Sequence, residues 1–143
     1  MSLYDCQLRL KEHLSSAFTQ PDIRTVDILA SELESDGIKQ TVQLPALFVM
    51  FRSGSANFNR PSYEMPVIVA VSSESHSKKT GQRNNLELVS NVSRFLLEHP
   101  VFGSELGGAY QIDPEMEVGL YALNARHCVV ILHVTVHDNN PAV

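Results

Sequence analysis

The sequence has few of the features that mark secreted or membrane proteins. Cys6 and Cys128 are its only cysteines, which excludes a disulfide framework and indicates two small core side chains in a reducing cytoplasm. No segment approaches the roughly 20 apolar residues needed to span a bilayer. Charged residues interrupt the amphipathic stretch Met1–Gln20, so it lacks the continuous apolar centre of a signal peptide. We therefore expect a soluble, unprocessed protein that does not enter a membrane.

Basic residues are outnumbered as well. The chain has 11 Lys and Arg against 16 Asp and Glu, for a formal net charge of -5. Binding to nucleic acid or to anionic lipid needs a basic excess that neutralises phosphates or headgroups. The charge balance therefore argues against both as the main function of this chain.

Catalytic and cofactor-binding motifs are missing too. Gly54 lies between two expected strands, and Gly103, Gly107 and Gly108 follow no strand-to-helix junction, so neither a phosphate loop nor a dinucleotide fingerprint is present. Cys6 lacks the glycine-rich elbow and the electropositive setting of a thiol nucleophile, which favours a packed thiol. We expect no enzymatic activity and no cofactor.

Two groups of ionisable residues are candidates for chemistry, and each has a simpler interpretation. His127, His133 and His137 would share one face of the final strand, but even the closest pair would be about 13 Å apart at roughly 3.3 Å per residue, too far for one metal ion. A second group alternates along a strand, which suggests a cation site or paired acids but is more typical of a solvated edge: Asp113, Glu115 and Glu117. We expect no metal site.

The apolar stretch Gln43–Arg52 organises the rest of the chain. It is too short for an uncapped helix and too apolar for a sheet edge, so we expect a buried central strand. Pro45 is tolerated near its start, before ladder hydrogen bonds are needed. Met65–Ser72 has the same character and should be its antiparallel neighbour, with Ser53–Ser62 as the long loop at the tip of the hairpin.

Helical and strand periodicity predicts the flanking elements. Before the central strand we expect a helix over Leu3–Phe18, a strand over Ile23–Leu29 with a helix through Leu33 as the alternative, and an acidic turn or short helix over Ser31–Asp36. After the hairpin we expect a flexible segment at Ser73–Arg83, a helix capped by Asn84 or Asn85 and closed by Pro100, a loop over Val101–Gly108, short strands at Tyr110–Ile112 and Glu117–Ala122, and a final strand over His127–His137.

These elements predict one domain of the α+β class over residues 1–138, followed by a frayed tail at 139–143. A mixed, mostly antiparallel sheet would be packed by two helices, and the 43% apolar content is sufficient for one core. The even-numbered residues from 128 to 136 are all apolar and should face that core. The strongest strand candidates contribute the core residues Leu47, Val49, Phe51, Val67, Val69, Leu132 and Val134.

The order of these segments resembles a known family. An N-terminal helix precedes the acidic S-E-L-E-S-D segment, which is followed by L-P-A-L-F-V-M-F-R-S-G and Y-E-M-P-V-I-V-A-V-S-S. A polar loop, the helix N-N-L-E-L-V-S-N-V-S-R-F-L-L, a variable segment and the closing strand V-V-I-L-H-V-T-V come next. Over most of its length the chain thus resembles the tail terminator and minor tail proteins of long-tailed bacteriophages.

The resemblance implies a small subunit that acts by binding and catalyses no reaction. It would form a homo-oligomeric ring, typically a hexamer, that caps the tail tube, ends tube polymerisation and contributes to head-tail joining. Its partners would be the tail tube protein and a head-completion protein, and DNA would pass through without specific binding. The protein would be made in the bacterial host cytoplasm and reside in the virion. The alternative from another class is a small-ligand-binding or regulatory α/β domain.

Charge is distributed unevenly along the chain, which suggests how such subunits meet. The segment Arg52–Arg83 contains five basic and two acidic residues, whereas Glu98–Glu117 contains five acidic residues and no Lys or Arg. A closed ring needs two different surfaces of one subunit to meet head to tail, and opposite charges would steer that encounter. The alternative is that the basic and the acidic segments are both ordinary solvated surface and take no part in an interface. The candidate interface residues are Arg52, Arg60, Lys78, Lys79, Arg83, Glu115 and Glu117.

Overall fold

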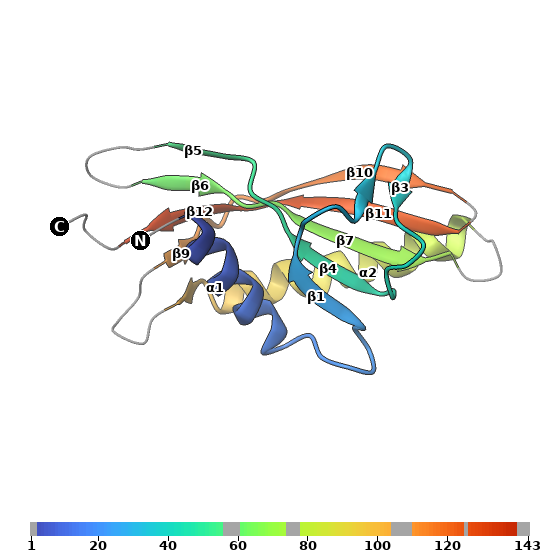
Figure 1. The fold of residues 1–143 in the computed structure, drawn as a ribbon. Coiled ribbons are helices and arrows are strands. Elements are labelled where there is room, and N and C mark those ends of the chain that lie inside the picture. The colour runs from blue at the N-terminus through green and yellow to red at the C-terminus, as the bar shows by residue number, and fades with distance from the viewer. Residues whose placement is uncertain (1–2, 56–60, 74–77, 104–109, 125, 140–143) are drawn as a thin grey trace.

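The computed structural model describes residues 3–55, 61–73, 78–103, 110–124 and 126–139. In this part of the chain, two helices and three mostly antiparallel sheets form an α+β domain. The predicted fold class is therefore confirmed, although the one expected sheet is replaced by two five-stranded sheets and a two-stranded hairpin. Figure 1 shows the two larger sheets one after the other along the long axis of the molecule.

The first sheet contains the most buried strands. Its strand order is β1 (Thr25–Ile28), β4 (Ala46–Val49), β7 (Val67–Ser72), β11 (His127–His133) and β10 (Glu117–Leu123). β1 runs parallel to β4, and the other neighbours are antiparallel. The apolar run of the sequence forms β4, which is buried along its whole length and pairs with β7 as expected. The middle position of the sheet, however, belongs to β7.

The backbone passes directly from strands of the first sheet into strands of the second sheet. Its order is β5 (Ser53–Ser55), β6 (Ser62–Glu64), β12 (Thr135–Asp138), β9 (Tyr110–Ile112) and β8 (Val101–Phe102). The connections between the two sheets lie side by side, because Met50 N donates to Pro66 O and Met65 N donates to Val134 O. Pro66 has no N–H with which to extend the ladder. The single final strand predicted over His127–His137 is therefore wrong, because it divides at Val134 into β11 and β12.

Both helices, α1 (Leu3–Ser15) and α2 (Lys78–Glu98), pack into one large core. α1 ends three residues before the predicted Phe18. Each helix contributes apolar residues at helical spacing, namely Cys6, Leu10, Leu14, Val89, Val92 and Leu96. The even-numbered residues of β11 and β12 face the same core, as their alternation predicts: Cys128, Val130, Leu132, Val134 and Val136.

A small hairpin covers part of the opposite face of the first sheet. β2 (Leu33–Glu34) pairs with β3 (Gly37–Ile38), and the hairpin packs on a second, smaller apolar cluster. Gly37 has a φ of 149°, and a Cβ at this position would overlap the His127 ring, so glycine is required. The predicted turn is confirmed at Ser35 and Asp36, which connect β2 to β3. A short helix is wrong, because Leu33 and Glu34 form the first strand of the hairpin.

Six of the seven expected core residues are buried, and Phe51 is the exception. Its side chain is 40% exposed. β4 ends at Val49, so Phe51 lies in the connection between the two sheets rather than inside a strand. A continuous apolar run does not show where a strand leaves its sheet, which is why the sequence placed this residue in the core. The confirmed core residues are Leu47, Val49, Val67, Val69, Leu132 and Val134.

α2 begins earlier than the sequence predicted. The helix already begins at Lys78, so the prediction of a flexible segment is wrong for Lys78–Arg83. The predicted helix cap at Asn84 or Asn85 is wrong for the same reason. Residues 74–77 lie outside the described part. A Cβ on Gly81 would overlap the serine that follows β7, so this glycine allows the first turns to approach the sheet closely. Tertiary packing therefore makes a helix of a segment whose composition indicates a loop.

The remaining predicted elements agree more closely with the structure. β1 confirms the strand interpretation of Ile23–Leu29, and β9 has the predicted bounds. The expected loop Val101–Gly108 begins as β8, and the expected loop Ser53–Ser62 includes β5; residues 56–60 and 104–109 are not described. Asn139, predicted to belong to a frayed tail, donates from its side chain to Gln111 Oε1 at 3.2 Å, while 140–143 lie outside the described residues.

An aromatic cluster joins α1, α2 and β8. The centroid of the His13 ring lies 4.8 Å from that of Phe95 and 5.4 Å from that of Phe102. The His13 Nε2–H donates to the carbonyl of His99 at 2.8 Å. Burial lowers the pKa of His13 below its ordinary value of 6.5, because the charged imidazolium loses part of its hydration.

We expect His13 to make the protein less stable in mild acid. Below about pH 6.5 the unfolded chain binds a proton on this residue more readily than the folded chain does, so protonation favours unfolding. Urea unfolding at about pH 7.5 and pH 5.5 should therefore show a smaller loss of stability in His13→Gln than in the unaltered protein. Equal losses in the two proteins would show that His13 has no part in the pH dependence.

Candidate functional site

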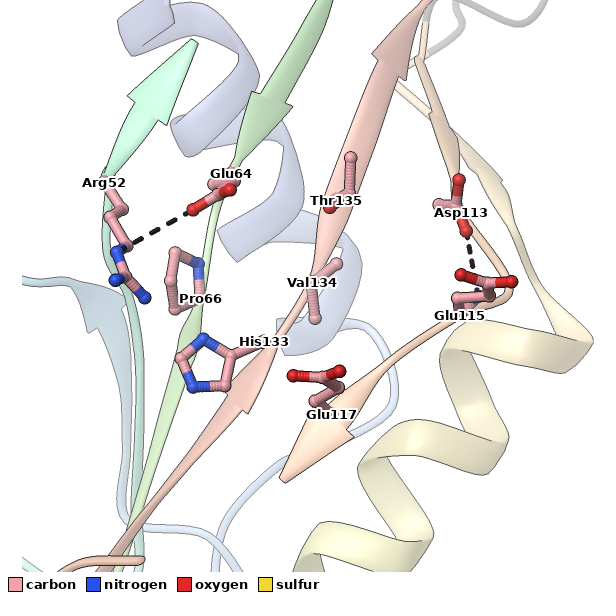
Figure 2. Close-up of a pocket in the computed structure, with 9 residues that line it drawn as sticks. All are labelled: Arg52, Glu64, Pro66, Asp113, Glu115, Glu117, His133, Val134 and Thr135. Carbon is pink, nitrogen blue, oxygen red and sulfur yellow. Dashed lines mark hydrogen bonds and ion pairs between the residues drawn. The ribbon is translucent and has the colours of Figure 1, made fainter. Parts of the chain in front are cut away.

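A cleft of about 460 Å³ lies where the two larger sheets meet (Figure 2). Residues of both sheets and of the segment between β9 and β10 line it, namely Arg52, Glu64, Pro66, Asp113, Glu115, Glu117, His133, Val134 and Thr135. In Figure 2 the charged side chains stand in front of the strands, and α1 runs behind them. We refer to this site as the acidic cleft.

Strand pairing brings the charged residues of the acidic cleft together. Glu117 is the cross-strand partner of His133, and Glu64 is the partner of Thr135. Partners on antiparallel strands point to the same face of a sheet. The residues of β6, β10, β11 and β12 that line the cleft are therefore far apart in the chain but adjacent in register.

The charge of the cleft is negative, because four carboxylates face one guanidinium. Arg52 Nε lies 3.7 Å from Glu64 Oε2, but both side chains are more than half exposed, so water weakens this pair. Asp113 Oδ2 lies 2.9 Å from His137 Nε2, and its other oxygen accepts from the backbone N of Glu115 at 2.9 Å. No ion pair within the described residues involves Glu115 or Glu117 through its side chain.

The three histidines of β11 and β12 lie in three different environments. His127 is buried, and its Nε2 lies 3.3 Å from the backbone N of Ile38. His133 lines the acidic cleft, and His137 pairs with Asp113. Across the described ranges, no group of three or more His, Cys, Asp or Glu side chains is arranged to hold a metal ion.

The two cysteines are packed in the core. Both are free and buried. Burial is the largest cause that raises the pKa of Cys6 to about 12, and burial also raises the pKa of Cys128. A thiol with a raised pKa stays protonated near pH 7 and is a poor nucleophile. This geometry agrees with the prediction that both are small core side chains.

A second charged surface follows the outer side of α2. Lys79, Arg83 and Arg94 line a shallow groove together with Leu86 and Glu87. These positions recur at intervals of three, four and seven to eight residues, so helical geometry places them on one side of the helix. Three cations against one carboxylate make this surface positive, and we refer to it as the basic groove.

The predicted interface residues are divided between these two surfaces. Glu115 and Glu117 both line the acidic cleft, as their alternation suggested. Arg52 was grouped with the basic residues by its place in the sequence, but it lies in the same cleft as the two glutamates. Its grouping with a separate basic surface is therefore wrong. The fold brings Arg52 to this cleft through the pairing of β5 with β6.

The other basic residues of the predicted interface that the structure describes belong to α2. Lys79 and Arg83 line the basic groove, and Lys78 is exposed in the first turn of the helix without lining the groove. Arg60 lies outside the described residues. Arg94 also lines the basic groove and was not predicted, although it lies eleven residues after Arg83, about three helical turns, so helical spacing indicates it. Glu64 was not predicted, and His133 was considered only as a metal ligand; the place of both in the cleft depends on strand register.

Fold and surfaces define a small α+β domain with an acidic cleft at the junction of two sheets and a basic groove on one helix. No protein-family model matches the chain, and no curated protein sequence matches it. Among the described residues, neither helix is long and apolar enough to cross a membrane.

Proposed function

We propose that this chain is a structural tail subunit of a long-tailed phage or prophage. It assembles into a ring, a hexamer in the form that the family resemblance implies, which caps the tail tube and ends its polymerisation. The ring contributes to head-tail joining and acts by binding to the tail tube protein and to a head-completion protein. DNA passes through the ring, and no cofactor takes part.

The observation that carries this proposal is the presence of two oppositely charged surfaces on one subunit. A ring closes when two different surfaces of the same protein meet head to tail. The acidic cleft has four carboxylates against Arg52, and the basic groove has three cations against Glu87. Opposite charges on such surfaces steer the encounter and select the correct orientation.

The order of the elements also supports the proposal. The chain contains, in this order and with further strands between them, an N-terminal helix, a buried strand, its antiparallel neighbour, a second helix and a closing pair of strands. This is the order on which the resemblance to tail terminator proteins is based. The net charge of -5 is compatible with a ring through which DNA passes, because an acidic protein repels phosphates and does not retain them.

The test is the mass of the purified protein over a range of concentrations, with charge reversals. Lys79→Glu combined with Arg83→Glu should weaken assembly by at least about tenfold, because like charges then meet across the interface. Adding Glu115→Lys and Glu117→Lys to the same chain should restore part of the loss. Raising the salt concentration from about 0.05 to 0.5 M should weaken the unaltered assembly.

A matched control is Arg24→Glu combined with Arg126→Glu. It changes the net charge by the same amount at exposed positions outside both surfaces. Assembly of this control should equal that of the unaltered protein. A chain that stays monomeric at every concentration, and gains thermal stability from a metabolite, would instead support a small-ligand-binding domain.

A further inference from the structure

Four large apolar side chains in or near the basic groove are about half exposed, and one of them, Leu86, lines the groove itself. Leu86 and Leu97 of α2 are 46% and 51% exposed, and Val118 and Leu120 of β10 are 52% and 58% exposed. Single exposed apolar residues are common on soluble proteins, but a group on one side marks an interaction surface. Whether the four form a group depends on which way α2 and β10 present them.

Helical geometry places both leucines on the side of α2 that faces away from α1. Phe95 contacts His13 and Phe18 of α1, so its side of α2 faces that helix. Leu86 precedes Phe95 by nine residues, about two and a half turns, and therefore lies on the opposite side. Leu97 follows Leu86 by eleven residues, about three turns, and shares its side.

That side of α2 faces the edge of the first sheet formed by β10. α1 packs over β1 and β4, whereas α2 packs over β7 and β11 and also contacts β10. The sheet order therefore puts β10 beyond α2 on the side away from α1. Figure 1 shows β10 and β1 at the two edges of this sheet.

Strand register places the two β10 residues on the helix-covered face. Val118 is the cross-strand partner of Leu132, and Leu120 is the partner of Val130. Both partners belong to the large core under the helices, and cross-strand partners point to one face. We refer to Leu86, Leu97, Val118 and Leu120 as the α2–β10 patch.

The edge beside this patch is also open. In the described part of the chain β10 pairs with β11 alone, so backbone groups along its other edge have no strand partner. A seven-residue edge strand with exposed apolar residues is a site where another chain can add. The patch therefore combines apolar area, an open edge and the cations of the neighbouring basic groove.

The acidic cleft lies on the opposite face of the same sheet. Glu117 and His133 are partners immediately next to the pair Val118 and Leu132, and successive residues of a strand point to opposite faces. The patch and the cleft of one subunit therefore cannot cover each other. In a ring both surfaces can be covered, because the patch of one copy can meet the cleft of the next copy.

We infer that the α2–β10 patch is the apolar part of the interface between subunits and that its occupant is a second copy of this chain. The second copy docks with the surface around its acidic cleft, so its carboxylates face Lys79, Arg83 and Arg94. The charge complementarity of the two surfaces selects this occupant. The inference rests on the proposed ring and names the surfaces through which it closes.

The first test removes apolar area and leaves charge unchanged. Leu86→Gln with Leu97→Gln, and Val118→Thr with Leu120→Thr, should each weaken assembly by about tenfold or more, because they replace apolar surface that association buries. The matched control, Tyr4→Gln with Val101→Thr, changes residues exposed to a similar extent, 57% and 49%, on other elements. It should assemble as the unaltered protein does.

The second test locates the contact directly. Copies with Arg83→Cys are mixed with copies with Glu117→Cys under mild oxidation, and a disulfide between the two copies is expected. The native Cys6 and Cys128 are buried and do not compete. The control pair, Arg83→Cys with Arg126→Cys, should give little cross-linking.

The outcomes separate this inference from the proposed function. An unaltered protein that stays monomeric at all concentrations overturns the ring and the inference together. A ring that forms normally in both patch variants, or that cross-links equally in the control pair, overturns the inference while the ring stands. Unfolding midpoints of the variants, which should match the unaltered protein because the residues are exposed, show whether lost assembly reflects misfolding.

Discussion

Asn85→Asp is expected to destabilise the domain by about 3 to 5 kcal/mol at neutral pH, enough to unfold much of the protein. Asn85 is fully buried in α2. Its Nδ2 donates to the carbonyl of Val69 in β7 at 2.9 Å and to the carbonyl of Cys128 in β11 at 2.7 Å. A carboxylate has no proton to donate there, and its oxygen would face two carbonyl oxygens without compensation.

The same replacement has a pH signature that distinguishes it from a simple packing defect. Burial should raise the pKa of the new carboxyl above its ordinary value of about 3.9 in an unfolded chain. The folded state then binds a proton more readily than the unfolded state, so the penalty is full at neutral pH and shrinks as the pH falls through the raised pKa. Chemical unfolding at about pH 7.5 and pH 5 measures this change.

Asn84→Asp is the matched control, because it makes the same chemical change at the neighbouring, partly exposed position of α2. Its free energy of unfolding should change by less than about 0.5 kcal/mol. If Asn85→Asp and Asn84→Asp were equally stable, Asn85 would not be the polar link between α2 and the sheet.

Phe48→Ala is expected to cost about 3 to 5 kcal/mol of stability, whereas Phe51→Ala should cost less than about 1 kcal/mol. The two residues belong to the same apolar run, but Phe48 is 2% exposed and Phe51 is 40% exposed. Phe48 lies in the cluster between the first sheet and the β2–β3 hairpin, so its removal leaves a cavity there. At Phe51 solvent already reaches the ring, and its removal leaves less of a cavity.

Guanidinium unfolding of the two variants under identical conditions gives the comparison, and Phe51→Ala serves as the internal control for Phe48→Ala. Equal and large losses would show that the connection between β4 and β5 is packed more tightly than its exposure indicates. Equal and small losses would show that the hairpin does not seal a core over Phe48.

Much of the fold was predictable, because periodicity depends on the local sequence. The alternation of residues 127–137 predicted which side chains face the core, and all five even positions are buried. The repeat of apolar residues in α2 predicted its packing face, although Gly81 and Asn85 show that its first turns are held by contacts with the sheet. No local pattern contains such contacts, which is why the start of this helix was misplaced.

The candidate site was only half predictable, for a related reason. Alternation identified Glu115 and Glu117 as neighbours on one face, and they do line one cleft. Their other neighbours, Glu64, His133 and Arg52, come from strands whose register is set by long-range pairing. Charge counted along the chain therefore grouped Arg52 with the basic residues, while the sheets place it among carboxylates.

The sequence by itself determined the α+β class, the interior strand β4, its pairing with β7 and the inward face of the final strands, since each depends on composition or on a period of two or 3.6 residues. Only the tertiary structure decided that the sheet divides at Pro66 and Val134, that Phe51 is exposed, and that acidic and basic surfaces lie on different faces of the molecule. Those features depend on which distant strands pair and in what register, and a pairing energy between distant residues leaves no period in the sequence.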